Sequence, residues 1–152
     1  MLFAGLSAGV MLHAAAVTAE YMAAPPVLSE KEAQRAHVNY LLHCAGCHLP
    51  SGKGAPGIVP DLGEYLGVFA QHEVSRSFLA RVPGASGAPV SDDELAAILN
   101  WILVTMNAAQ LRADFRPYTG TEVGRYRRDP LIDVMPERAA LIKRMHQAAS
   151  RD

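Results

Sequence analysis

The chain of 152 residues is poor in several residue types, and each shortage excludes a class of protein. It has only two cysteines, so a framework of disulfides is excluded. Its formal net charge is −1, which gives no case for nucleic-acid binding or for a polybasic membrane patch. Aromatic residues make up 7% of the chain, and no sustained alternation of apolar and polar residues predicts a strand. Half of the residues are apolar, which is enough for the core of one domain with tails.

Both cysteines belong to one short motif, Cys44-Ala45-Gly46-Cys47-His48. The spacing C-x-x-C-H is the signature of covalent haem c attachment. Two thiols on one tight turn add to the two vinyl groups of a haem, and the imidazole that follows ligates the iron from one face. A redox dithiol would need a βαβ context, and a zinc site would need four ligands at better spacing. We therefore predict one haem c attached through Cys44 and Cys47, with His48 as an iron ligand.

The start of the chain has the composition of an export signal. Residues 1–19 carry no acidic or basic side chain apart from His13, and Val17-Thr18-Ala19 fits a small-x-small cleavage site. We expect residues 1–19 to be a signal peptide, which predicts a periplasmic protein. The alternative is a retained anchor, the only basis here for membrane association. Residues 20–28 contain Pro25-Pro26 and are expected to be an extended leader.

The remaining sequence predicts an all-α fold. A capping box of Ser29 and Glu32 predicts a helix over about 30–43, and a second, of Ser91 and Glu94, predicts the best helix, over about 92–106. Weaker periodicity indicates one or two short helices within 64–82. Residues 49–61 and 83–89 are rich in proline and glycine and are expected to be loops. A third capping box begins at Thr119, and a last helix is expected over about 136–149.

Residues 29–106 resemble a class I cytochrome c, a small helical electron carrier with one haem. The resemblance is carried by the haem motif, by Tyr40 four residues before it, by Gly52, Gly54 and Pro60-x-Leu62 after it, and by Ser91-Asp92-Asp93-Glu94-Leu95. It implies a helical domain around one covalently bound haem, in which the Pro60 carbonyl accepts a hydrogen bond from His48 Nδ1 and fixes the ligand's orientation. It also implies that Tyr40 meets the face formed by Leu95, Ile98 and Leu99. Residues 107–152 lie beyond this domain, and we refer to them as the C-terminal extension.

One departure from that family concerns the second axial ligand of the iron. The family supplies a methionine, often as Met-Pro, in the loop before its last helix, whereas this loop ends in Ala88-Pro89. The candidates for a sixth ligand are Met106, His72, and the less favoured Met135 and His146. An open or water-bound position is the further alternative. Met106 and His72 each have an ordinary structural explanation, as a core residue and as a solvated helix residue.

These features predict a single-electron carrier between redox proteins, either free or as the cytochrome subunit of a dehydrogenase. The protein would not be an enzyme, because the sequence offers no distal acid–base pair for peroxidase chemistry. The alternative function is a gas-binding or sensing haem protein with an open distal site. The C-terminal extension is rich in Arg and Tyr, which indicates either a partner-binding surface or a segment that wraps the domain. Trp101 lies outside the main apolar stripe of its helix and is expected to pack under the extension or to contact a partner.

Overall fold

The computed structural model describes residues 27–150, and most of these residues lie in helices. Within that range the only β-type pairing is an isolated bridge between Ala55 and Val59, so the predicted all-α class is confirmed. The elements are α1 (Glu30–His43), α2 (Ala45–His48), α3 (Leu62–Gln71), α4 (Glu73–Arg76), α5 (Phe78–Arg81), α6 (Pro83–Ser86), α7 (Asp92–Met106), the 3₁₀ turn η1 (Ala108–Gln110), α8 (Gly120–Tyr126) and α9 (Val134–Ala149).

The two longest predicted helices of the cytochrome-like region begin where their capping residues place them. Ser29 and Glu32 form a complete capping box at α1, and Ser91 and Glu94 form another at α7. In each box the serine oxygen accepts a backbone N–H and the glutamate satisfies the backbone of the serine. The predicted bounds of both helices are confirmed. At α8, Thr119 accepts from Glu122 N, but the Glu122 carboxylate bonds elsewhere and only half of the third box forms.

Two segments contain more helix than the sequence indicated. Residues 62–81 form three helices rather than one or two, because Asp61 caps α3 and extended backbone at His72 ends it. Residues 83–86 form a helical turn, α6, where a loop was expected. Proline suits the first position of a helix because it has no N–H to leave unpaired there, and Pro83 occupies that position. The last helix, α9, begins at Val134, two residues earlier than expected.

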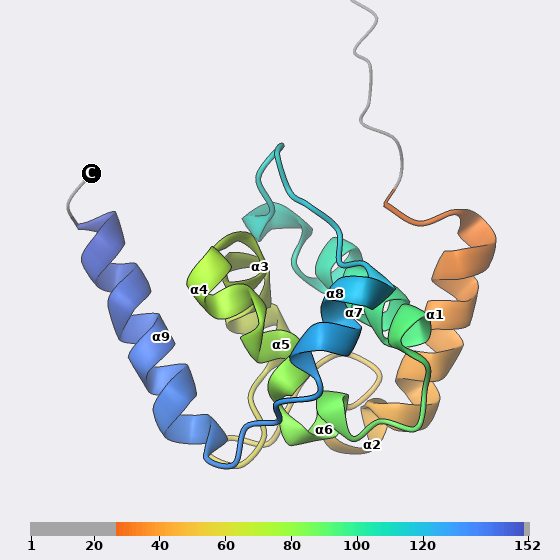
Figure 1. Ribbon diagram of the computed structural model, residues 1–152, viewed down its shortest axis with the longest axis horizontal. Helices are drawn as coiled ribbons and strands as arrows, with labels where there is room; N and C mark the ends of the chain where they lie inside the picture. The colour runs from red at the N-terminus through yellow and green to blue at the C-terminus, as the bar shows by residue number, and fades with distance from the viewer. Residues whose placement is uncertain (1–26, 151–152) are drawn as a thin grey trace, which may run out of the picture.

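Helices α1 and α8 both pack against α7, which forms the centre of the fold (Figure 1). Tyr40 of α1 is fully buried and clusters with Ile98 and Ile102 of α7. Leu95 and Leu99, also expected beside Tyr40, belong to a second cluster with Phe69 and Phe78. Trp101 packs neither under the extension nor on the surface alone. Its ring stacks on His37 at 4.7 Å and lies 5.2 Å from the Tyr40 ring, so α1 explains its position.

The C-terminal extension shares the core of the preceding domain. Tyr118, Val123 and Leu141 are at most 3% exposed and pack in the cluster formed by Leu95 and Leu99. The polar side chain of Asn100 on α7 exchanges two hydrogen bonds with the Tyr118 backbone, at 2.8 and 2.9 Å. Residues 118–126 therefore wrap the domain and complete its core, which was one of the two alternatives for this segment.

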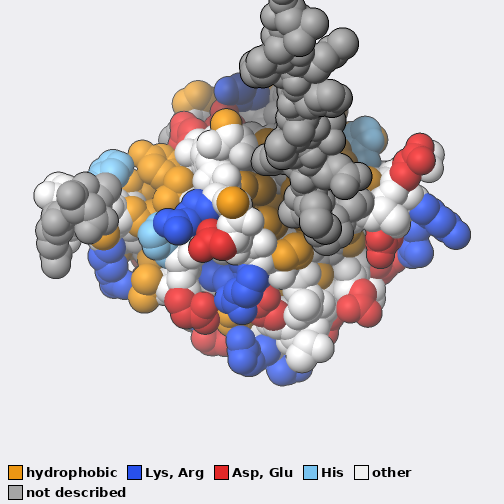
Figure 2. All heavy atoms as spheres, turned by 90° about the horizontal axis from the view of Figure 1, so that it is seen from above, with side chains coloured by type: hydrophobic (Ala, Val, Ile, Leu, Met, Phe, Trp, Pro, Cys, Tyr) orange, Lys and Arg blue, Asp and Glu red, His pale blue; other side chains and the backbone are white. Residues whose placement is uncertain are grey.

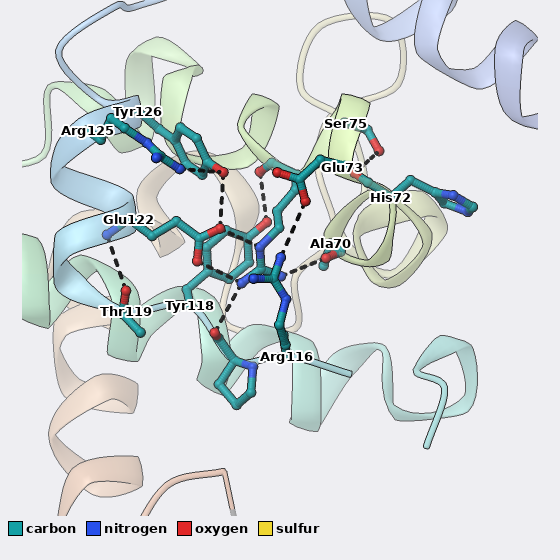
Figure 3. Close-up of polar contacts among 12 residues, drawn as sticks. Ala70, His72, Glu73, Ser75, Arg116, Tyr118, Thr119, Glu122, Arg125 and Tyr126 are labelled. Atoms are coloured by element: carbon teal, nitrogen blue, oxygen red, sulfur yellow. Dashed lines mark hydrogen bonds and ion pairs between the residues drawn. The ribbon is translucent and has the colours of Figure 1, made fainter. Parts of the chain in front are cut away.

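A buried ion pair ties α4 to α8. Arg76 is 2% exposed and donates two hydrogen bonds to the Glu122 carboxylate, at 2.6 and 2.9 Å. It also donates to the carbonyls of Ala70 and Pro117, and its guanidinium carbon lies 3.9 Å from the centroid of the Tyr118 ring. Figure 3 shows Tyr118, Glu122 and Tyr126 close together on one segment, and the Tyr126 hydroxyl donates to the Glu122 carboxylate. The guanidinium charge is thus removed from water and fully paired.

An arginine of the C-terminal extension binds the loop between α5 and α7. Arg127 is 13% exposed, and its guanidinium donates to the backbone carbonyls of Ser86, Ala88 and Val90. It also pairs with Asp92 at 3.3 Å. These contacts hold the loop that ends in Ala88-Pro89 at three separate points.

The outer surface carries charges of both signs. On the face shown in Figure 2, basic and acidic side chains lie beside one another rather than in separate areas. Over the described range, no helix has both the length and the apolar character needed to cross a membrane. The expected signal peptide over 1–19 and most of the expected leader over 20–28 lie outside the described residues.

Candidate functional site

The Cys-x-x-C-H motif lies at a sharp corner between two helices. α1 ends at His43, and the four-residue α2 carries Cys47 and His48. The backbone N–H of Cys44 still bonds to Tyr40, and the N–H groups of Cys47 and His48 both bond to the Cys44 carbonyl. This turn brings both thiols and the imidazole to one cavity. Burial raises the pKa of the Cys44 thiol, with a smaller contribution from Cys47.

The His48 ring is oriented by a backbone carbonyl. Its Nδ1 lies 3.1 Å from the Pro60 oxygen, the contact that the family resemblance implies. A donor at Nδ1 leaves Nε2 as the unprotonated nitrogen, which is the form that binds a metal. Burial lowers the pKa of this imidazole, against the opposing effects of the Pro60 carbonyl and the Asp61 carboxylate. The lowered pKa favours a neutral ring, and the Pro60 carbonyl favours the tautomer that donates from Nδ1.

The backbone immediately after His48 is also fixed. Leu49 has a positive φ of 56°, a conformation that costs energy for a residue with a side chain. The Tyr40 hydroxyl donates to the Leu49 carbonyl and holds the turn in place. Gly52 has φ of +81°, and a Cβ there would lie 2.6 Å from the Met106 sulfur. This glycine is needed both for its backbone angle and for the close approach of Met106.

The cavity beside the motif is lined almost wholly by apolar side chains. About 1040 Å³ of space, part of it open to solvent, lies between its walls. Besides the motif, its lining residues are His43, Pro60, Leu62, Leu66, Phe69, Phe78, Leu79, Val82, Gly84, Ala85, Leu95, Ile98, Leu99, Ile102, Val134 and Arg138. A large, flat and mostly apolar cofactor fits such walls. The thiols, the oriented imidazole and the apolar lining together suit a covalently attached haem.

The candidates for a sixth iron ligand lie outside this cavity. Met106 packs against Gly52 and Leu62, on the side of the loop that follows His48. His72 is an exposed residue at the end of α3. Met135 and His146 line a separate groove along α9. Gly84 and Ala85 are the residues that the segment between α5 and α7 contributes to the wall, and neither can ligate iron through a side chain.

Sequence reasoning missed the contribution of the last helix to the site. Val134 and Arg138 of α9 both line the cavity, although they lie about 90 residues after the motif. No local signal indicated this, because the position of α9 depends on Leu141, which is 1% exposed in the core. Arg138 lies one helical turn before Leu141, on the same face of α9. This relation can be recognised only when the buried face of the helix is known.

The fold and the site thus define a helical protein whose C-x-x-C-H turn opens on an apolar cavity that suits a haem. Cytochrome c-552 of Thermus thermophilus is 31% identical to the chain over 118 residues, which cover 64% of this chain and 90% of that relative. A second cytochrome c-552 of the same species is 31% identical over 118 residues, with 80% of its length covered. No protein-family model and no solved structure matches the chain.

The chain belongs to the class I c-type cytochromes. This membership confirms the predicted fold class and the predicted class of function, electron transfer rather than enzymatic catalysis. It also implies haem c as the cofactor.

Proposed function

We propose that the protein is a periplasmic carrier of single electrons, with one haem c attached through Cys44 and Cys47 and ligated by His48. The observation that carries this proposal is the contact between His48 Nδ1 and the Pro60 oxygen at 3.1 Å, beside two thiols and an apolar cavity. When bound, the haem supplies an iron that cycles between the ferrous and ferric states. The chain's own residues bind it, orient its ligand and exclude water.

The attachment is tested by expressing the protein in a bacterial host that attaches haem to exported cytochromes. We expect a mass increase of one haem and haem staining that survives denaturing electrophoresis. Cys44→Ser and Cys47→Ser should each weaken the attachment, and the double variant should lose it. Asp114→Asn is a matched control, because Asp114 is an exposed surface residue far from the cavity lining. Unchanged staining in the double variant would refute the assignment.

The proposed location depends on residues 1–19. Cleavage after Ala19 would release a protein that starts at Glu20 into the periplasm. The mass of the purified protein reports the cleavage directly, and fractionation of the cells reports the compartment. A protein that retains residues 1–19 in the membrane fraction would instead be an anchored cytochrome.

We propose that a redox partner docks on the apolar side chains that flank the motif. Leu41 and Leu42 precede it at the end of α1, Leu49 follows it, and Val38 lies one turn earlier; these side chains are 41–69% exposed. Exposed apolar groups of this kind, close to a redox centre, favour a transient partner interface. Two partners fit this role, a free redox protein and the catalytic subunit of a dehydrogenase of which this chain is the cytochrome subunit. Leu42→Glu should slow electron exchange without changing the reduction potential, whereas Val74→Glu, at an equally exposed site on α4, should have no effect.

A second candidate function is binding of a small neutral gas at the iron. Its support is that Met106, His72, Met135 and His146 all lie outside the cavity lining among residues 27–150. The optical spectrum of the reduced protein, with and without CO, separates the two functions. An immediate spectral change with CO would favour gas binding, whereas sharp α and β bands that do not respond would favour the carrier. Met106→Leu and His72→Ala identify any ligand that moves to the iron on haem attachment.

A further inference from the structure

The haem cavity has one Lys or Arg side chain in its described lining, Arg138 of α9. The other titratable groups there are His43 and His48 and the two thiols. A haem carries two propionate carboxylates on the side of the ring opposite its vinyl groups. A carboxylate beside apolar walls is unfavourable unless it is hydrogen-bonded or paired with a cation. The cavity therefore needs a group that can receive such a carboxylate.

The guanidinium of Arg138 has donors to spare. Its side chain is 16% exposed, and among the described residues it makes one hydrogen bond, from Nη2 to Glu64 Oε2 at 2.9 Å. Arg127 is buried to a similar extent, at 13% exposed, but it is bonded to three carbonyls and a carboxylate. Arginine has five N–H donors in a planar fork that matches a carboxylate. Arg138 can thus keep its contact with Glu64 and bind a second carboxylate.

The position of α9 suits this role. Thioether formation at Cys44 and Cys47 fixes the vinyl side of the ring at the corner of α1 and α2. Figure 1 shows α2 at the lower right and α9 along the left edge, with α5 between them. The guanidinium also lies over the Tyr65 ring, 5.2 Å from its centroid, which restrains it beside α3. Leu141, one turn later, anchors the helix in the core.

We propose that Arg138 binds a haem propionate and so gives the last helix a direct part in setting the reduction potential. This inference rests on the proposed function, because it requires haem at Cys44 and Cys47. The cation stabilises the ionised propionate and lowers the pKa of that carboxyl group. It also favours the ferrous iron, because reduction removes one positive charge from the site. The charged or titratable groups that face Arg138 from outside the haem cavity are Glu64 on α3, the Lys53–Asp61 pair of the loop after the motif, and Lys143 and His146 of its own helix.

The test is a redox titration of the haem-loaded protein at several pH values, after the attached haem has been verified by mass. In Arg138→Gln we expect the ferrous-to-ferric ratio, poised at the wild-type midpoint, to fall about threefold. This equals about 28 mV at 59 mV per tenfold change for a one-electron couple. The variant should also gain a step in which the potential falls as the pH rises and the propionate ionises. Arg138→Lys should retain most of the wild-type behaviour.

The matched control is Arg144→Gln, which removes the same charge from an exposed site on the same helix. It should leave the potential and its pH profile unchanged. Equal behaviour of the Arg138 and Arg144 variants would overturn the proposal. So would weaker CO binding in Arg138→Gln with an unchanged pH profile, because Arg138 would then face a ligand on the iron.

A further variant keeps the proposal testable if Arg138→Gln does not accumulate with haem. Glu64→Gln leaves the cation in place and removes its protein carboxylate, so the potential should rise. A lower potential in Glu64→Gln would refute propionate binding. Absence of haem from the wild-type protein would refute the proposed function itself, whereas attached haem with no response to Arg138 would refute only this inference.

Discussion

Removing the carboxylate of Glu122 should destabilise the protein more than any other single charge change in the C-terminal extension. Glu122→Gln leaves the Arg76 guanidinium, 2% exposed, with two carbonyl partners and no counter-charge. Removal of one partner from a buried ion pair costs about 3–5 kcal/mol. With an m-value of about 2 kcal/mol/M in urea, a loss of about 4 kcal/mol lowers the unfolding midpoint by about 2 M.

The measurement is urea unfolding followed by far-ultraviolet circular dichroism on the haem-loaded protein. Asp114→Asn serves as the control, because Arg112 and Asp114 form a pair that is 75% and 73% exposed and should contribute less than about 1 kcal/mol. Replacing both partners, as Arg76→Met with Glu122→Leu, should recover much of the loss, since apolar residues of similar volume often substitute for a buried pair. A loss below about 1 kcal/mol in Glu122→Gln would refute the reasoning.

The same pair predicts a dependence on pH. Burial alone would raise the pKa of Glu122, but the hydrogen bonds and charge of Arg76 outweigh it and the pKa lies below its usual value. A carboxylate whose pKa is lower in the folded than in the unfolded state contributes its full stability above the unfolded pKa. That contribution is lost as the pH falls through the folded pKa. The difference in unfolding free energy between wild type and Glu122→Gln should therefore shrink on acidification below about pH 4.

Three further changes have defined expectations. Gly52→Ala should lower the free energy of unfolding by about 1–2 kcal/mol because of the positive φ at this position, and by more because the Met106 sulfur is displaced. Thermal unfolding measures the loss, and an unchanged Tm would contradict the close packing. Ser91→Ala should cost about 1 kcal/mol by loss of the cap of α7, whereas Ser86→Ala, which removes no cap, should be close to neutral in the same assay. Arg127→Gln should lower the free energy of unfolding by about 2 kcal/mol and increase the rate of amide hydrogen exchange at Ser86–Val90. An exchange rate equal to that of the wild type would show that the guanidinium does not hold the loop.

The elements with local signals were predictable from the sequence. The boxes at Ser29 and Ser91 determine where α1 and α7 begin, because each satisfies backbone groups within three residues of itself. The contact between the haem motif and Pro60 could be predicted only from the family resemblance. The third box failed in part because Glu122 has a stronger partner 46 residues away in Arg76, and no local pattern reports a tertiary ion pair.

The parts that could not be predicted depend on tertiary packing. Trp101 lies outside the apolar stripe of α7, and only the position of α1 reveals His37 as its stacking partner. α9 lies about 90 residues after the motif and has no local pattern that relates it to the haem, so the sequence did not indicate that Val134 and Arg138 reach the cavity. The helical turn at 83–86 was obscured by Pro83, Gly84 and the following Gly87, because proline and glycine usually indicate a loop.

The three carbonyl contacts of Arg127 have a consequence for anyone redesigning this cytochrome. A methionine-bearing loop cannot simply be grafted between α5 and α7, because the guanidinium would lose the acceptors at Ser86, Ala88 and Val90. The graft would leave a largely buried cation with only Asp92 of its described partners, and a simultaneous neutral substitution at position 127 should rescue it. Loop length and the residue at 127 are thus expected to vary together, so that a lineage can change its distal ligand only by also altering its C-terminal extension.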